Sequence, residues 1–165
     1  EYQLYIGRIL LLIIIGFMQS ALICLGDLFF LGIQCKHPVM FVLTGMFTSF
    51  VYVNLIYALT VSFGDIGKAI AVVLMVMQVA GSGGTFPIQC APKFFQVVYP
   101  LLPFTHSMNA MRECIAGFYG TTYAAEIGKL AIYLVPSLLL GLLLRKPIIK
   151  MNDAFMEKLE STHLI

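Results

Sequence analysis

The feature that most constrains the fold of this chain is the stretch 39–63, which contains no charged side chain. The stretch 9–33 is nearly as apolar and carries a single charge, Asp27. A helix rises about 1.5 Å per residue and the hydrocarbon core of a bilayer is about 30 Å thick, so each stretch is long enough for one transmembrane helix. Because 60% of the residues are hydrophobic and only 11% are charged, we expect an all-α polytopic membrane protein in contact with lipid.

Two further transmembrane helices are expected at 66–82 and 123–144, which gives four spans in all. Gly64 suits the position that follows a helix end, and Asp65 suits the N-cap of the next helix. The second and third spans should therefore join in a tight turn. In the fourth span, Pro136 should kink the helix near its middle.

The third span runs into a glycine-rich sequence, Gly81 to Pro87, before it has clearly crossed a membrane. A helix from Ala69 to Ala80 is only about 18 Å long, so the break would fall at membrane depth. Backbone freed there must be buried in protein or line a water-filled cavity. If the helix instead continues to Thr85 it spans about 25 Å, and this argument weakens.

The segment 83–122 is expected to lie at the outer face and to be seated in the membrane. Pro92 and Pro103 each stand where a helix would begin, which predicts two short helices near 92–99 and 103–117. The second helix carries apolar residues at helical spacing along one face, and that face needs an apolar surface to cover it. These residues are Phe104, Met108, Met111, Ile115 and Phe118.

The tail 147–165 alternates apolar and charged residues at helical spacing, which predicts an amphipathic helix at the cytoplasmic surface of the membrane. Positive residues gather at the start of this tail and favour the cytoplasm. With four spans, both termini are then cytoplasmic, and the turn 34–38 lies outside. The positive residues are Arg145, Lys146, Lys150 and Lys158.

Composition and motifs exclude several kinds of function. The net charge of +2 and the absence of a basic stripe argue against nucleic-acid binding. Four cysteines without CxxC spacing argue against a metal site, and no cofactor is predicted. The sequence Gly64 to Ala69 lacks the first glycine and the final Ser or Thr of a phosphate loop, so any ATPase must be a separate chain. The first residues show no charged and apolar leader, so no signal peptide is expected.

We also expect no enzyme activity and predict no catalytic residue. Ser82 lies in the glycine-rich segment and His106 on a later helix, as in an intramembrane serine protease. No acidic residue is seen that would orient His106, so we interpret it as a structural group. Glu126 and Lys129 are expected to extend to the membrane interface instead.

Three charged residues remain as candidates for a site. Asp27 is either an inward-facing polar group or a carboxylate that reaches the outer headgroups. Arg112 and Glu113 are adjacent on a helix, so each needs a different partner in seating the helix 103–117. We expect helix-end carbonyls to serve Arg112, and Lys93 or Lys129 to serve Glu113.

Several of these motifs together resemble the C-terminal membrane region of YhgE/Pip proteins, a phage infection protein family within the type-2 ABC exporter permeases. The matching runs are Gln78 to Pro87, Pro92 to Phe95, Pro100 to Phe104, and Arg112 with Glu113 through Gly117. The resemblance implies a bacterial cell membrane protein with six spans, of which these four are the third to sixth. It also implies a dimer or a partner membrane subunit, and a separate ATPase.

Two functions follow from the resemblance. In the first, the chain is a transport or secretion subunit whose broken segment forms an outer gate or vestibule; the alternative for that segment is a tight turn with no pathway. In the second, the spans only anchor a surface receptor or scaffold. The residues assigned to the gate are Gln78, Gly81, Ser82, Gly83, Gly84, Thr85, Phe86, Pro87, Phe94 and Phe95.

Overall fold

A computed structural model describes residues 2–84 and 86–143 of the chain. These residues form helices joined by short connections, with no strand among them. Three stretches are long and apolar enough to cross a membrane, namely Tyr5–Phe29, Pro38–Gly81 and Thr122–Leu142. The described part of the chain is therefore all-helical, and the chain is a multi-pass membrane protein. The predicted amphipathic tail 147–165 lies outside the described residues.

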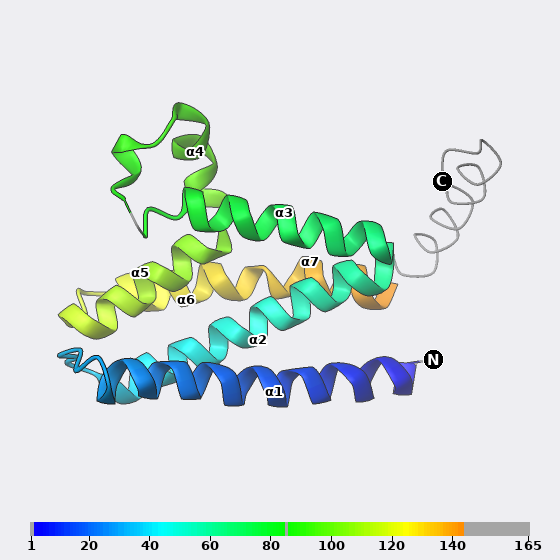
Figure 1. Cartoon of the computed structure of the whole chain (residues 1–165), viewed down its shortest axis with the longest axis horizontal. Coiled ribbons are helices and arrows are strands. Elements are labelled where there is room, and N and C mark those ends of the chain that lie inside the picture. The colour runs from blue at the N-terminus through cyan, green and yellow to red at the C-terminus, as the bar shows by residue number, and fades with distance from the viewer. Residues whose placement is uncertain (1, 85, 144–165) are drawn as a thin grey trace.

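The first two long helices, α1 (Tyr2–Phe29) and α2 (Pro38–Phe63), run antiparallel along the whole length of the molecule (Figure 1). The α2 bounds agree with the predicted span 39–63. The predicted span 9–33 is wrong at its end, because α1 stops at Phe29 and Gly32 has a positive φ of 63° in the following turn. Such a φ favours glycine and does not continue a helix.

The third helix, α3 (Asp65–Gly81), turns back along α2, so the apolar stretch Pro38–Gly81 is a helical hairpin. Gly64 ends α2 with a φ of 59°, as expected for a helix C-terminus. Asp65 was expected to be an N-cap. It is the first helical residue instead, and its carboxylate accepts from Lys68 at 2.8 Å.

The hairpin depends on Gly67, where a Cβ would collide with the carbonyl oxygen of Leu59. We expect Gly67→Ala to lower the free energy of unfolding by about 1–3 kcal/mol, because a backbone atom cannot move aside as a side chain can. Gly128→Ala is the matched control, since no neighbouring atom lies within 4 Å of a Cβ there. Unfolding in detergent micelles, followed by circular dichroism, measures both; equal stability of the two variants would contradict this account.

The next long helical stretch consists of α6 (Thr122–Ile132), α7 (Leu134–Leu138) and a π-helical turn, η3 (Leu139–Leu143). The helix is interrupted directly after Ile132, which lies four residues before Pro136. The proline ring clashes with the Ile132 carbonyl, and proline has no backbone N–H to donate to that carbonyl. The helix is thus interrupted at Tyr133, close to the position where a kink was predicted. Its candidate membrane stretch, Thr122–Leu142, agrees with the predicted 123–144 within the described residues.

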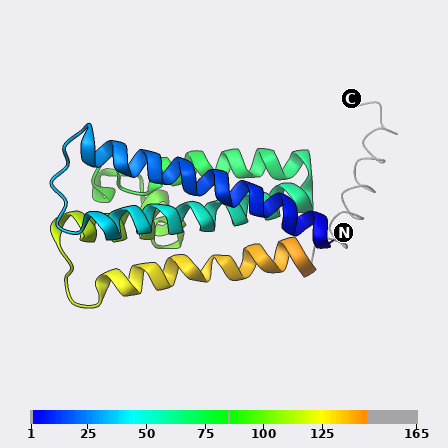
Figure 2. The ribbon, with the colours of Figure 1, turned by 90° about the horizontal axis from the view of Figure 1, so that it is seen from below.

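Between α3 and α6, the chain forms η1 (Ile88–Cys90), α4 (Lys93–Val98), η2 (Tyr99–Leu101) and α5 (Pro103–Ala116). Pro103 opens α5 as predicted, whereas Pro92 lies just before α4 as its N-cap. Figures 1 and 2 show α3 ending partway along the long axis while α2 continues to the far end. The helix α5 begins near the end of α3 and covers the remaining length.

The helix α5 is fixed at that far end by the connection between α1 and α2. The amide of Lys36 donates to the Ile115 carbonyl at 3.3 Å, and the amide of His37 donates to the Cys114 carbonyl at 3.2 Å. Met111 and Ile115 pack against a buried cluster of Cys24, Phe41 and Cys114. Part of the predicted apolar face of α5 is therefore covered by α1 and α2. The described ends, residues 2 and 143, both lie at the opposite end of the molecule.

Candidate functional site

The turn at the end of α3 is tightly packed on its inner side, the side that faces Phe95 and Leu102. A Cβ on Gly81 would lie 2.9 Å from Leu102 and 3.1 Å from Phe95. Ser82 is 1% exposed, and its hydroxyl donates to the Val79 carbonyl at 3.4 Å and accepts from the Gly84 amide at 3.3 Å. The Ser82 hydroxyl is thus used within the turn and does not line an open pathway.

The outer side of the same turn is hollow. A pocket of about 420 Å³ lies between the glycines, η1, η2 and α5. The terminal NH2 group of Arg112 donates to the Gly83 carbonyl at 3.0 Å, and Phe86 at the rim is 75% exposed. The residues that line the pocket are Gly83, Gly84, Phe86, Pro87, Ile88, Gln89, Tyr99 and Arg112.

The structure brings together only some of the residues that were assigned to a gate. Phe95 packs on Gly81, and Phe94 meets Phe95 edge to face with ring centroids 5.4 Å apart. Gln78 is buried one turn before Gly81, where its amide oxygen accepts from the Tyr52 hydroxyl of α2. That contact borders a separate apolar groove between α2 and α3, and Thr85 lies outside the described residues.

The adjacent residues Arg112 and Glu113 have different partners, as helix geometry requires. Arg112 bonds to Gly83, a carbonyl just past a helix end, which is the kind of partner that the sequence indicated. Glu113 accepts from the Tyr119 amide at 2.7 Å and so stabilises the turn after α5. The interpretation that Lys129 serves Glu113 is wrong, because Lys129 bonds to Glu126.

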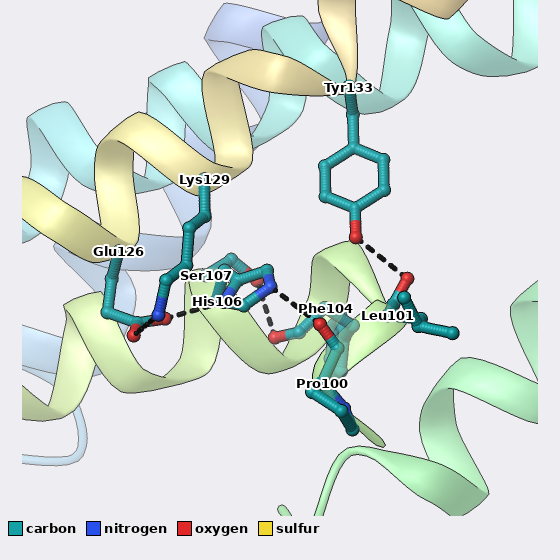
Figure 3. A network of polar contacts seen from close by, with 8 residues as sticks. All are labelled: Pro100, Leu101, Phe104, His106, Ser107, Glu126, Lys129 and Tyr133. Carbon is teal, nitrogen blue, oxygen red and sulfur yellow. Dashed lines mark hydrogen bonds and ion pairs between the residues drawn. The ribbon is translucent and has the colours of Figure 1, made fainter. Parts of the chain in front are cut away.

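A second cluster of polar groups lies where α5, α6 and η2 meet (Figure 3). The His106 Nδ1 lies 2.6 Å from the Glu126 Oε2, and the His106 Nε2 lies 3.1 Å from the Pro100 carbonyl oxygen. Lys129 donates to the Glu126 Oε1 at 3.0 Å, and the Tyr133 hydroxyl donates to the Leu101 carbonyl at 2.7 Å. The helix α6 thereby holds both α5 and the turn before it.

Two sequence-based expectations about this cluster are wrong. Glu126 does not extend to an interface but is 7% exposed, and it supplies the acidic partner that His106 was expected to lack. The two residues are 20 positions apart on opposite arms of the α5–α6 hairpin, so no local pattern links them. The sequence did contain one signal for such a contact, because Glu126 lies within an apolar span and a carboxylate there is costly unless it is paired.

The geometry of the cluster suits the positioning of helices more than it suits nucleophilic chemistry. The Ser107 hydroxyl donates to the Phe104 carbonyl at 2.9 Å, within its own helix. Both nitrogens of His106 are already occupied by Glu126 and Pro100. The cluster therefore ties three segments together by buried hydrogen bonds.

Asp27 lies in the last turn of α1, at the end of the molecule that also holds the 30–37 connection. The residue is partly exposed, and its backbone carbonyl accepts from the Ile33 amide at 3.4 Å. Among the described residues, its carboxylate has no ion pair within 4 Å. Its place near a helix end leaves both of its proposed roles open.

Comparison with known proteins adds a family to this geometry. The family described as "ABC-2 family transporter protein" matches residues 1–144. "Uncharacterized protein YhgE" of Bacillus subtilis (strain 168) is 30% identical over 115 residues, which is 70% of this chain. The aligned part is 15% of the length of that protein, so this chain corresponds to a small portion of it. No solved structure matches the chain with significance.

Proposed function

Because this chain belongs to the ABC-2 family of transporter proteins, we propose that it forms the membrane pathway of an exporter. The family and the three apolar stretches make it a YhgE-like, transporter-like membrane subunit. The proposal goes further and gives the segment between α3 and α5 the role of an outer gate. A pure anchor for a surface receptor or scaffold is not favoured by membership of a transporter family.

The observation that carries the gate is the early end of α3. This helix stops partway along the bundle, and the chain then leaves it, forms the pocket of about 420 Å³ and returns as α5 (Figure 1). The helix is about 25 Å long, so the chain leaves it slightly short of a hydrocarbon core of about 30 Å, where backbone has to be buried or to face water. The inner side of the turn, with Gly81 and Ser82, is packed. The proposed resting state is therefore closed, and the pocket next to Phe86 is its outer mouth.

The proposed topology has four crossings. The stretch Pro38–Gly81 is a hairpin of two antiparallel helices, and a helix of the length of α3 spans about 25 Å, close to the thickness of a hydrocarbon core. The positive residues from Arg145 onward favour the cytoplasm, which would place both termini there. The proposed location is a bacterial plasma membrane.

The proposed assembly is a homodimer, or a pair with another membrane subunit, that works with a separate ATPase. Family membership supports the ATPase, because the proteins of this family typically work with one. The chain itself would carry out no enzymatic reaction. It would use no cofactor or metal of its own, and its other contacts would be with lipid.

The gate can be tested with thiols placed on the two sides of the turn. We expect Phe86→Cys to react with an impermeant thiol reagent in sealed cells, because position 86 is exposed at the pocket. Ser82→Cys should stay inert until the partner ATPase turns over, since position 82 is 1% exposed at rest. Site-resolved mass spectrometry measures both rates.

The natural Cys90, which is exposed, reports whether the reagent reaches this segment. If position 82 stayed inert during turnover while position 86 reacted, the packed turn would be the better account of the segment. If position 86 reacted only in opened cells, the proposed orientation would be wrong.

A further inference from the structure

Both ring nitrogens of His106 face oxygen atoms that accept hydrogen bonds. The Nδ1 lies 2.6 Å from the Glu126 Oε2, and the Nε2 lies 3.1 Å from the Pro100 carbonyl (Figure 3). A carbonyl oxygen only accepts, and so does an ionised carboxylate. A neutral imidazole has a single N–H, so it would leave one ring nitrogen with its lone pair against an oxygen.

Two arrangements of protons satisfy both contacts. In the first, an imidazolium donates from Nδ1 to Glu126 and from Nε2 to Pro100. In the second, a protonated Glu126 donates to Nδ1, and the Nε2–H donates to Pro100. Each arrangement holds one proton more than a neutral imidazole with a carboxylate. We infer that His106 and Glu126 together form a proton-binding site, which holds one proton while α5, α6 and η2 are packed.

The surroundings of the pair support such a site. The side chains of His106 and Glu126 are 8% and 10% exposed, so water does not readily replace either contact. Among the described residues, the other charged group in contact with the pair is Lys129, which donates to the second carboxylate oxygen and is itself half exposed. Tyr133 lies on the remaining side, with its ring centroid 6.3 Å from that of His106, and its hydroxyl is bonded to Leu101.

On α2, the titratable side chain of Tyr52 lies close enough to Tyr133 to interact with it electrostatically. Its hydroxyl is bonded to Gln78 and therefore does not compete for His106. The proton thus has its direct contacts with His106 and Glu126, at the junction of three segments.

Loss of the proton removes one of the two contacts, because the remaining imidazole has a single N–H. Either the bond between η2 and α5 is lost, or the bond between α5 and α6 is lost, and the local packing at that contact is weakened. The contacts are therefore complete when the pair is protonated, and one of them is lost as the pH rises. The site itself does not depend on transport; only its effect on an outer gate rests on the proposed function.

The proton can be counted by nuclear magnetic resonance of the complete chain, labelled with ¹⁵N at histidine and with ¹³C at the glutamate carboxyl groups and held in lipid nanodiscs. The chain has three histidines, and the signal of interest is the one that disappears in His106→Asn. We expect protons on both ring nitrogens, or one ring proton together with a protonated Glu126 seen by ¹³C. A ring with one proton beside an ionised Glu126, at every pH at which the chain is folded, would overturn the inference.

The release of α5 can be followed with a thiol placed by Ser107→Cys, next to His106 and 2% exposed. Its labelling rate is divided by that of the exposed Cys90, which corrects for the effect of pH on thiol reactivity. We expect this ratio to rise about tenfold or more from acidic to alkaline pH, because local opening exposes the thiol. The ratio should not change with pH in His106→Asn.

A ratio that stays constant in both proteins, or rises equally in both, would contradict the proton-dependent contact. Neither readout measures transport, so a failed gate and a failed proton site give different results. If the proton count were as expected and position 82 stayed inert during turnover, the proton site would be supported and the gate would be contradicted.

Discussion

Glu126→Ala is expected to lower the free energy of unfolding by about 3–5 kcal/mol, the range found when one partner of a buried ion pair is removed. The substitution leaves the Nδ1 of His106 without its partner in a site that is 8% exposed. Lys129 contributes less to the loss, because its side chain is 52% exposed and can turn toward water. The readout is unfolding of the complete chain in detergent micelles.

Glu113→Ala is the matched control for this prediction, because Glu113 is also a hydrogen-bonded glutamate of the same region. It accepts one bond, from the Tyr119 amide, at an exposed turn, so we expect a cost of about 1 kcal/mol. Glu126→Gln should lie between the two, since the amide oxygen can still accept from the ring. Equal losses in Glu126→Ala and Glu113→Ala would show that the buried cluster does not hold α5 to α6.

The transmembrane helices could be predicted from the sequence because each depends on local composition. The uncharged stretch 39–63 corresponds to α2, and the break at Gly81 follows from the glycines themselves. The prediction of helix ends was wrong where two neighbouring residues suit the same position. Asp65 suits an N-cap, but Gly64 takes that place and the carboxylate binds Lys68.

The His106–Glu126 contact could not be predicted in the same way, because the α5–α6 hairpin creates it. The distance between these residues depends on how two helices pack across the turn 117–121. The Arg112 contact with Gly83 is also tertiary, since 29 positions separate the two residues. Its type was predictable, because carbonyls past a helix end need donors and arginine supplies them. Local rules thus gave the kind of partner, and packing selected the residue.

Arg112→Ala is expected to raise the labelling rate of the thiol created by Ser82→Cys by about tenfold or more in the resting protein. The guanidinium group joins α5 to the residue that follows Ser82, through its 3.0 Å bond to the Gly83 carbonyl. A bond to a charged donor contributes about 1.5 kcal/mol or more, which corresponds to roughly a tenfold change in local opening. Arg112→Lys should restore part of the protection, because an ammonium group can still donate to one carbonyl.

Lys93→Ala is the matched control for Arg112→Ala. It removes an exposed cation from the neighbouring α4, and no ion pair of Lys93 is found in the part of the chain that the structure describes. If Lys93→Ala increased labelling as much as Arg112→Ala, the effect would come from the charge of the outer surface and not from the bond. If neither variant changed the rate in a folded and inserted protein, the turn at Gly81 would be held by its packing against Phe95 and Leu102 alone. A rate that rises only in Arg112→Ala would identify this bond as the contact that keeps the end of α3 closed.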